Sequence, residues 1–250
     1  MQRSDALTFR TFSSKIGHSS RPHSHPYGQF TYVRNGLISL RTETEVWINE
    51  TRRLFWIPPG ITHSSYSRGP VDGWLVWIAP EHAQVLPQQV CVLRASSLLV
   101  AALERLGGLT EHENRLADIL LELVQLEVLH TETDSLKLRL PSSLRLLAWA
   151  MTFLDAPSIR VSIDGAASQA GMSRRAFTRH FQSQTGCTFS QWKRMAMVQR
   201  ATERLTEGSS VTTIAFELGY ENPSAFIAMF KALRGASPRQ FLSSANNLGF

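Results

Sequence analysis

The chain has 250 residues, of which 43% are hydrophobic and 18% are charged, a balance that excludes a wholly disordered chain and allows one or two domains. No apolar run approaches the roughly 18–20 residues of a membrane span, and the polar first residues lack the pattern of a secretory signal. The two cysteines, Cys91 and Cys187, cannot form a disulfide framework. We therefore expect a cytoplasmic protein with reduced thiols and no membrane partner.

The formal net charge of +6 falls entirely in the last part of the chain. Residues 1–140 carry 14 basic and 14 acidic side chains, whereas residues 141–250 carry 12 Lys and Arg against 6 Asp and Glu. This asymmetry favours a neutral module joined to a basic module that binds a polyanion. An ordinary solvated basic surface is the alternative.

Residues 1–95 have the pattern of a β domain. Short runs rich in Val, Ile, Trp, Phe and Tyr alternate with turn signals such as Pro58-Pro59-Gly60. The runs QFTYVRNG and LISLRTETEVWIN predict two strands around a turn at Asn35-Gly36. Many short strands at this spacing favour a small barrel or a sandwich.

Helical spacing begins near residue 96. A first helix is expected to end at Gly107-Gly108, and a second is expected over 111–130. The second helix carries an apolar stripe formed by Leu116, Ile119, Leu120, Leu123 and Leu126. The stripe either covers the β domain or pairs with the same helix of a second chain as a dimerisation element, and the sequence leaves both readings open.

The helical period is lost over TETDSLKLRLPS and returns afterwards, which predicts a linker and then an all-helical domain. The expected division is 1–95 for the β domain, 96–130 for the helical dimerisation segment, 131–142 for the linker and 143–250 for the helical domain. The predicted fold class is therefore α+β with two domains.

The helical domain contains an internal repeat. One copy runs from Ala166 to Trp192 and the other from Ala215 to Phe241. The pairs at an offset of 48 or 49 are Gly171 with Gly219, Phe177 with Phe226, Phe181 with Phe230, Gly186 with Gly235, and Trp192 with Phe241. In each copy a helix, a glycine turn and a second helix capped by Ser or Asn predict a helix-turn-helix unit, whose second helix can enter a DNA major groove.

The repeat resembles the DNA-binding domain of the AraC/XylS family of bacterial regulators over residues 142–250. The matching signature is Ile214-Ala215, Gly219-Tyr220, Phe226, Phe230-Lys231, Gly235 and Ser237-Pro238, and the stretch Pro223–Phe230 most resembles the NimR-like branch. The resemblance implies two helix-turn-helix units joined by one long helix over Phe189–Glu207. It also implies double-stranded promoter DNA and RNA polymerase as partners, with activation of transcription commoner than repression.

The first recognition helix has a polar outer face. Because Phe177 and Phe181 point inward, the outward residues are Arg174, Arg175, Thr178, Arg179 and Gln182. Arginine can bind guanine through two hydrogen bonds, so Arg175 and Arg179 are the expected base readers. The family resemblance places base contacts at Arg175, Thr178 and Arg179. For Arg174, phosphate contact and simple solvation remain alternatives.

The second recognition helix has small residues on its outer face and no long polar reader there. Ser224 can bond a base edge or a phosphate, and Ala228 can contact a thymine methyl group. This second unit is therefore expected to hold mainly the DNA backbone, through Lys231, Arg234, Arg239 and the positive N-terminus of the helix.

A second motif lies in the β domain: His23-x-His25, then Gln29, then Pro58-Pro59-Gly60-x-x-His63. It resembles the cupin pattern, in which three His and one Glu bind a metal inside a β-barrel, and it resembles the sensor half of AraC-type proteins. Gln29 occupies the acidic position. Three His alone can bind Zn²⁺, so a divalent metal and a metal-free pocket for an organic effector are both open.

Together these patterns predict a ligand-responsive transcription regulator that binds DNA as a homodimer, with a cupin-like N-terminal β-barrel and a C-terminal all-α domain. The alternatives are a metal-dependent cupin enzyme with a helical appendage and a constitutive DNA-binding protein whose β-barrel no longer binds a ligand. We favour the regulator, and expect no catalytic residues, because an enzyme does not need a duplicated basic helix-turn-helix unit.

Overall fold

The computed structural model describes residues 7–109, 113–133 and 137–246. Its chain contacts divide it into two compact units. The first unit contains Trp47–Lys137 and the residues up to Glu43, and the second contains Thr44–Val46 and the residues from Leu138 onward. No described helix is both long enough and apolar enough to cross a membrane.

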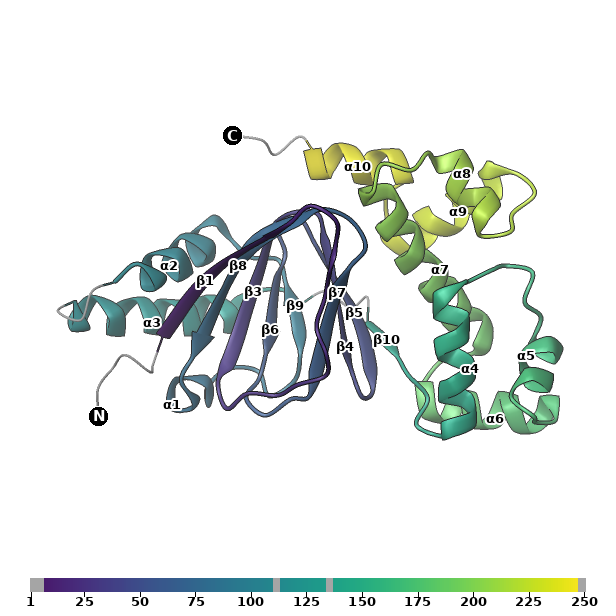
Figure 1. Ribbon diagram of the computed structural model, residues 1–250, viewed down its shortest axis with the longest axis horizontal. Helices are drawn as coiled ribbons and strands as arrows, with labels where there is room; N and C mark the ends of the chain where they lie inside the picture. The colour runs from purple at the N-terminus through teal and green to yellow at the C-terminus, as the bar shows by residue number, and fades with distance from the viewer. Residues whose placement is uncertain (1–6, 110–112, 134–136, 247–250) are drawn as a thin grey trace. The chain divides into compact units, whose positions relative to one another are not determined.

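The first unit is built on two antiparallel sheets (Figure 1). Within the described residues the strands are β1 (Leu7–Ser14), β2 (His18–Ser19), β3 (Gly28–Asn35), β4 (Leu37–Thr42), β5 (Glu45–Glu50), β6 (Leu54–Ile57), β7 (His63–Ser67), β8 (Val71–Ile78), β9 (Cys91–Leu93) and β10 (Lys137–Arg139). One sheet has the order β1-β8-β3-β6-β9 and the other β10-β5-β4-β7-β2. The strand pairs of the described residues do not close a barrel.

One expected strand is divided in the structure. The run LISLRTETEVWIN forms β4 and β5 instead of a single strand. The turn at Asn35-Gly36 is present, and Gly36 has a φ of 86°. A Cβ atom at Gly36 would lie 2.2 Å from the carbonyl oxygen of Pro70, so this turn requires glycine.

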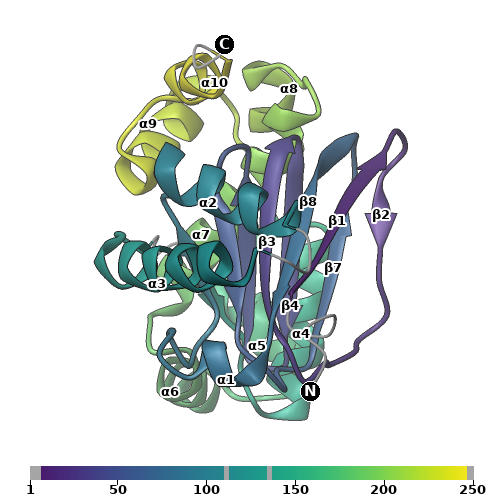
Figure 2. The same cartoon turned by 90° about the vertical axis from the view of Figure 1, so that its left-hand side faces the viewer.

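Helices cover one face of the first sheet (Figure 2). They are α1 (Pro80–Ala83), α2 (Ser97–Gly107) and α3 (Asn114–His130). Alternation along β3 places Phe30 toward these helices, in one core cluster with Leu103 and Val124. The other face of β3 carries Val33, which belongs to the cluster that also contains Leu40 of the second sheet.

Helix α3 faces the sheet with a different side from the one that the sequence stripe indicated. Its buried residues are Leu121, Val124 and Val128, with Leu120 and Leu123 packed partly against the same core. Ile119 and Leu126 are 54% and 51% exposed. The helix therefore covers the sheet and also presents an apolar outer side. Residues 111 and 112 of the expected helix lie outside the described residues.

The segment expected to be a linker contains regular structure. Strand β10 lies within it, and Leu138 and Leu140 are buried in the core of the second unit. The backbone N–H of Leu140 donates to the carbonyl of Thr44, 2.7 Å away. The loss of the helical period predicts a linker in this segment, and within it the alternation Leu-x-Leu buries two side chains. Residues 134–136 lie outside the described residues.

The second unit is helical after β10 (Figure 1). Its described helices are α4 (Leu144–Asp155), α5 (Ile163–Gln169), α6 (Arg174–Thr185), α7 (Phe189–Thr206), α8 (Val211–Glu217), α9 (Pro223–Arg234) and α10 (Pro238–Asn246). Helices α5 and α6 form one helix-turn-helix unit, α8 and α9 form the other, and α7 connects them. The predicted repeat of two helix-turn-helix units joined by one long helix is confirmed.

Both units of the repeat use the same local devices. The side chains of Ser173 and Asn222 cap α6 and α9 by accepting from the backbone N–H three residues later, at 3.3 and 3.1 Å. The turns between the paired helices contain Gly171 and Gly219, whose φ angles are 64° and 83°. These local signals explain why the repeat could be read from the sequence.

Candidate functional site

Helix α6 presents a continuous polar face to solvent. The exposed residues on this face are Arg175, Thr178, Arg179 and Gln182, which follow the i, i+3, i+4, i+7 spacing of a single helix side. Arg174 is also exposed, but it forms an ion pair with Asp164 at 3.1 Å. Arg175 and Arg179 therefore have the exposure and spacing that base reading requires.

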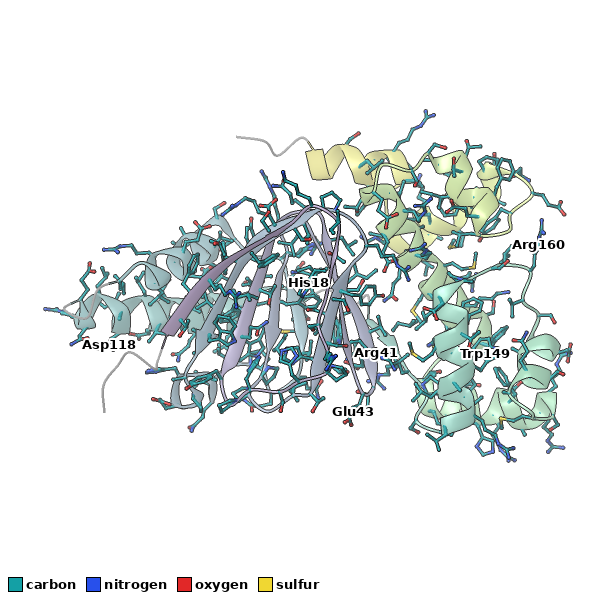
Figure 3. The ribbon with its side chains drawn as sticks, viewed as in Figure 1. His18, Arg41, Glu43, Asp118, Trp149 and Arg160 are labelled. Carbon is teal, nitrogen blue, oxygen red and sulfur yellow. The ribbon has the colours of Figure 1, made fainter. Side chains whose placement is uncertain are left out.

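An aromatic cluster fixes the inner face of α6. Trp149 of α4, labelled in Figure 3, lies edge-on to Phe177 and Phe181, with ring centroids 5.5 and 5.8 Å apart. Trp192 of α7 lies edge-on to Phe181 at 5.4 Å. Because these rings are buried, α6 cannot rotate about its axis without losing them, and its arginines stay outward.

Besides Asp164, which pairs with Arg174, acidic residues on α7, at its C-terminal end and on α8 form ion pairs in the second unit. Arg204 of α7 pairs with Glu207 and with Glu217 of α8, both at 2.7 Å. Arg200 pairs with Glu203 at 2.9 Å. These carboxylates are neutralised by their own arginines, so they leave the charge of Arg175 and Arg179 uncompensated.

Helix α9 differs from α6 as the sequence indicated. Ser224 and Ala228 are exposed, and so is Lys231. Arg234 is only partly exposed and lies over the ring of Phe241, 4.9 Å from the centroid. Burial lowers the pKa of Arg234 to about 10. Its packing against Phe241 makes Arg234 a weaker candidate for phosphate contact than Lys231.

The four residues of the cupin-like motif lie together in the first unit. One ring nitrogen from each of His23, His25 and His63 lies within 4.8 Å of the others. Gln29 Oε1 is 3.0 Å from His25 Nε2. His23 is exposed, His25 is intermediate and His63 is buried, so the cluster extends from the surface inward. Burial lowers the pKa of His63, which favours its neutral form.

Backbone hydrogen bonds hold the two segments of this cluster together. His23 and His63 exchange N–H to carbonyl bonds of 2.9 Å each, as in an antiparallel pair. The N–H of Gly60 donates to the carbonyl of His25 at 2.9 Å. The motif residues that are separated in sequence are therefore placed by three main-chain bonds.

A buried polar chain continues from the cluster, and the sequence reasoning missed it. Gln29 Nε2 donates to Thr31 Oγ1 at 2.9 Å, and Asn49 Nδ2 donates to the carbonyl of Thr31 at 3.1 Å. Gln29 and Thr31 alternate onto the same side of β3 as Val33. The period of two could have indicated Thr31, whereas Asn49 comes from another strand and had no local signal.

The β-sheet unit with its polar cluster and the basic unit with two helix-turn-helix motifs define a two-domain DNA-binding protein. Residues 8–129 match the profile of the AraC-like ligand binding domain, and residues 166–244 match that of a helix-turn-helix domain. The chain belongs to the AraC family of transcriptional regulators.

Among curated proteins, the HTH-type transcriptional regulator NimR of Escherichia coli is 25% identical over 227 residues, which are 90% of this chain and 83% of NimR. Among solved structures, the DNA-binding domain of AdpA in complex with a target DNA is 29% identical, with a TM-score of 0.39 over 43% of this chain and all of that one. ToxT of Vibrio cholerae with bound unsaturated fatty acid is 10% identical, with a TM-score of 0.41 over 99% of this chain and 98% of that one.

Proposed function

We propose that this transcriptional regulator binds duplex promoter DNA through α6 and α9, with α6 as the base-reading helix. The observation that carries the proposal is the exposed face of α6, where Arg175, Thr178 and Arg179 share one side of a rigidly held helix. A helix of this kind fits the major groove, and arginine there reads guanine.

Helix α9 serves mainly to hold the DNA backbone. Its outer face offers Ser224 and Ala228, which are too short to bond bases as arginine does, and its positive N-terminus attracts phosphate. Lys231 supplies an exposed charge on the same helix.

Replacing Lys231 with alanine is expected to weaken binding to specific and unrelated duplexes alike. One lost phosphate contact lowers the slope of log affinity against log salt by about one. Anisotropy titrations of a labelled duplex at several salt concentrations measure that slope. An unchanged slope would show that Lys231 does not contact phosphate. Ser224→Ala on the same helix is the control, because it removes no charge and should leave the slope unchanged.

The β-sheet unit is proposed to bind a small-molecule effector at the cluster of His23, His25, Gln29 and His63. Support comes from the match to a ligand-binding domain and from the convergence of four polar side chains at one end of the sheets. The proposed outcome of binding is activation of transcription through RNA polymerase, in the bacterial cytoplasm where promoter DNA lies.

Transcription with purified polymerase tests the direction of regulation. The template would carry the sequence to which the protein binds most tightly, upstream of a weak promoter. We expect added protein to raise the transcript yield, and the Arg175→Ala and Arg179→Ala double variant to leave it at the level without protein. A fall in yield with wild-type protein would make the chain a repressor.

A metal-dependent cupin enzyme with a helical appendage is the less favoured function. The family profile over residues 8–129 is that of a ligand-binding domain, and the second unit has the architecture of a DNA-binding domain. A binding role for the histidine cluster accounts for both units, so we propose no catalytic residue.

The outer side of α3 is the proposed dimer interface. Ile119 and Leu126 are more than half exposed, and the partly buried Leu116 and Leu123 complete a 3-4-3 spacing along one side of the helix. This spacing is that of a two-helix seam. Leu120 and Leu123 of the expected stripe also pack partly against the core of their own unit, so Ile119 and Leu126 contribute most to the proposed interface.

The double change Ile119→Asp and Leu126→Asp is expected to give a folded monomer. Two charges in an apolar seam prevent pairing, while the buried side of α3 stays intact. Operator binding should weaken by about 100-fold or more, because two linked half-sites are then bound singly. Sedimentation at micromolar concentration measures the assembly.

Leu98→Asp provides the matched control, since Leu98 is 52% exposed on α2 and lies outside the proposed seam. This variant should remain dimeric. A wild-type chain that sediments as a monomer, or a double variant that remains a dimer, would contradict the interface.

A further inference from the structure

We propose that the three histidines of the cluster, together with Gln29, form a binding site for one divalent transition-metal ion, and that Zn²⁺ fits this ligand set. The binding itself does not depend on DNA recognition. Its use as an input to transcription rests on the proposed function.

The first argument is the orientation of the imidazole rings. In every one of the three, Nδ1 lies within hydrogen-bond distance of a backbone carbonyl two residues away: 2.8 Å for His23 with Arg21, 2.6 Å for His25 with Tyr27 and 2.8 Å for His63 with Ile61. A carbonyl oxygen only accepts, so each Nδ1 carries the proton. Each neutral ring is thereby left with a free lone pair on Nε2.

This arrangement is the one that metal-bound histidines show. Their second nitrogen donates to a carbonyl or a carboxylate, which fixes the tautomer and the ring orientation and makes the first nitrogen a better ligand. Three such rings within 4.8 Å are prepared for a shared cation. Packing alone would not require three neighbouring histidines to share one tautomer.

The second argument is an unmatched contact between two acceptors. Gln29 Nε2 donates to Thr31 Oγ1, so Gln29 Oε1 faces His25 Nε2 at 3.0 Å. Both atoms offer lone pairs, and with Nδ1 protonated a neutral imidazole has no second proton to place between them. A cation bound by both atoms resolves the mismatch, because an imidazole nitrogen and an amide oxygen can each donate a lone pair to a metal.

The opposite amide orientation of Gln29 is the alternative. In that arrangement Gln29 Nε2 donates to His25 Nε2 and the Thr31 hydroxyl donates to Gln29 Oε1, and no cation is required. The two arrangements differ in whether Gln29 Oε1 is available as a ligand, which a metal titration can separate.

The chemistry of the donors selects the ion. Three imidazole nitrogens and one amide oxygen suit Zn²⁺ and its first-row neighbours, whereas Mg²⁺ and Ca²⁺ prefer all-oxygen sites. The exposed ring of His23 lies at the surface end of the cluster, which gives an ion a route from solvent. The neutral donors leave the charge of the ion uncompensated, so this site should bind metal more weakly than one with a carboxylate.

The test is a titration of the full chain, stripped of metal by a chelator, with Zn²⁺ alone. We expect one ion per chain for the wild type. His23→Ala and His63→Ala should each weaken Zn²⁺ binding by more than about 100-fold. Replacing a residue that only hydrogen-bonds a metal ligand weakens binding by about 10- to 100-fold. His23 is exposed, so its replacement tests the site even if His63→Ala fails to fold. Gln29→Glu should tighten binding, and Gln29→Leu should weaken it.

His18→Ala is the matched control, because His18 is exposed on β2 of the same unit (labelled in Figure 3). It should bind Zn²⁺ as the wild type does. Less than about 0.1 ion per chain, or equal losses in His18→Ala and His23→Ala, would overturn the inference. Unchanged affinity in both Gln29→Leu and Gln29→Glu would remove Gln29 from the ligand set. None of these results involves DNA, so they would leave the proposed regulator standing.

Discussion

Replacing Arg179 with alanine is expected to weaken binding to the protein's preferred duplex by about 1–3 kcal/mol and to relax its choice at one or two base pairs. The residue is exposed on the face of α6 that also carries Arg175 and Thr178. Its loss removes a pair of directed hydrogen bonds to a base edge. Affinity for the preferred and for a scrambled duplex, measured at one fixed salt concentration, gives both quantities.

Two further variants separate base reading from simple charge. Arg179→Lys keeps the positive charge but loses the planar pair of donors, so it should bind the scrambled duplex as the wild type does and still lose specificity. Arg10→Ala removes an exposed arginine from the other unit and should change neither affinity. If Arg179→Ala leaves both affinity and preference intact, the assigned face of α6 is wrong.

Alanine at Phe181 or at Phe230 is expected to lower the free energy of unfolding by about 3–5 kcal/mol. These residues occupy equivalent places in the repeat, and both are fully buried, at 0% exposure. The loss at Phe181 should be the larger, because its ring meets Trp149 and Trp192, whereas the aromatic neighbours of Phe230 are phenylalanines. Denaturant unfolding followed by circular dichroism measures each change.

Phe216→Ala is the control for this pair, since Phe216 is a phenylalanine of α8 that is 55% exposed. Its replacement should cost far less, because little apolar surface leaves the core. A loss in Phe181→Ala as small as that in Phe216→Ala would contradict the view that this ring anchors the recognition helix.

The second unit was predictable because its signals are local. Gly171 and Gly219 mark the two turns through their positive φ, Ser173 and Asn222 cap the two recognition helices, and the apolar spacing fixes which side of each faces inward. The exposed face of α6 follows directly from the burial of its two phenylalanines. The residues of the histidine cluster were likewise visible as a motif.

The features that the sequence did not reveal depend on contacts between distant residues. Which side of α3 faces the sheet depends on its packing with Leu103 and Phe30. This packing buries Leu121 and Val124, which the expected apolar stripe did not include. The strand β10 forms because Leu138 and Leu140 are buried in a core made by residues that are distant in the sequence. No local sequence pattern indicates the buried side of α3 or the formation of β10.

The same limit applies to the chemistry of the cluster. The sequence placed Gln29 near three histidines and left a metal and an organic effector as alternatives. The argument for metal comes from three Nδ1 to carbonyl bonds and from one acceptor facing another. These relations depend on side-chain orientation, which spacing alone does not determine.

The most direct test of the central claim is selection of bound sequences from a random duplex library with purified wild-type protein and with Arg175→Ala and Arg179→Ala. The account predicts that the wild type enriches one defined motif and that each variant loses information at separate positions within it. Enrichment of no motif by the wild type, or of the same motif at the same strength by all three proteins, would contradict a regulator that reads DNA through α6.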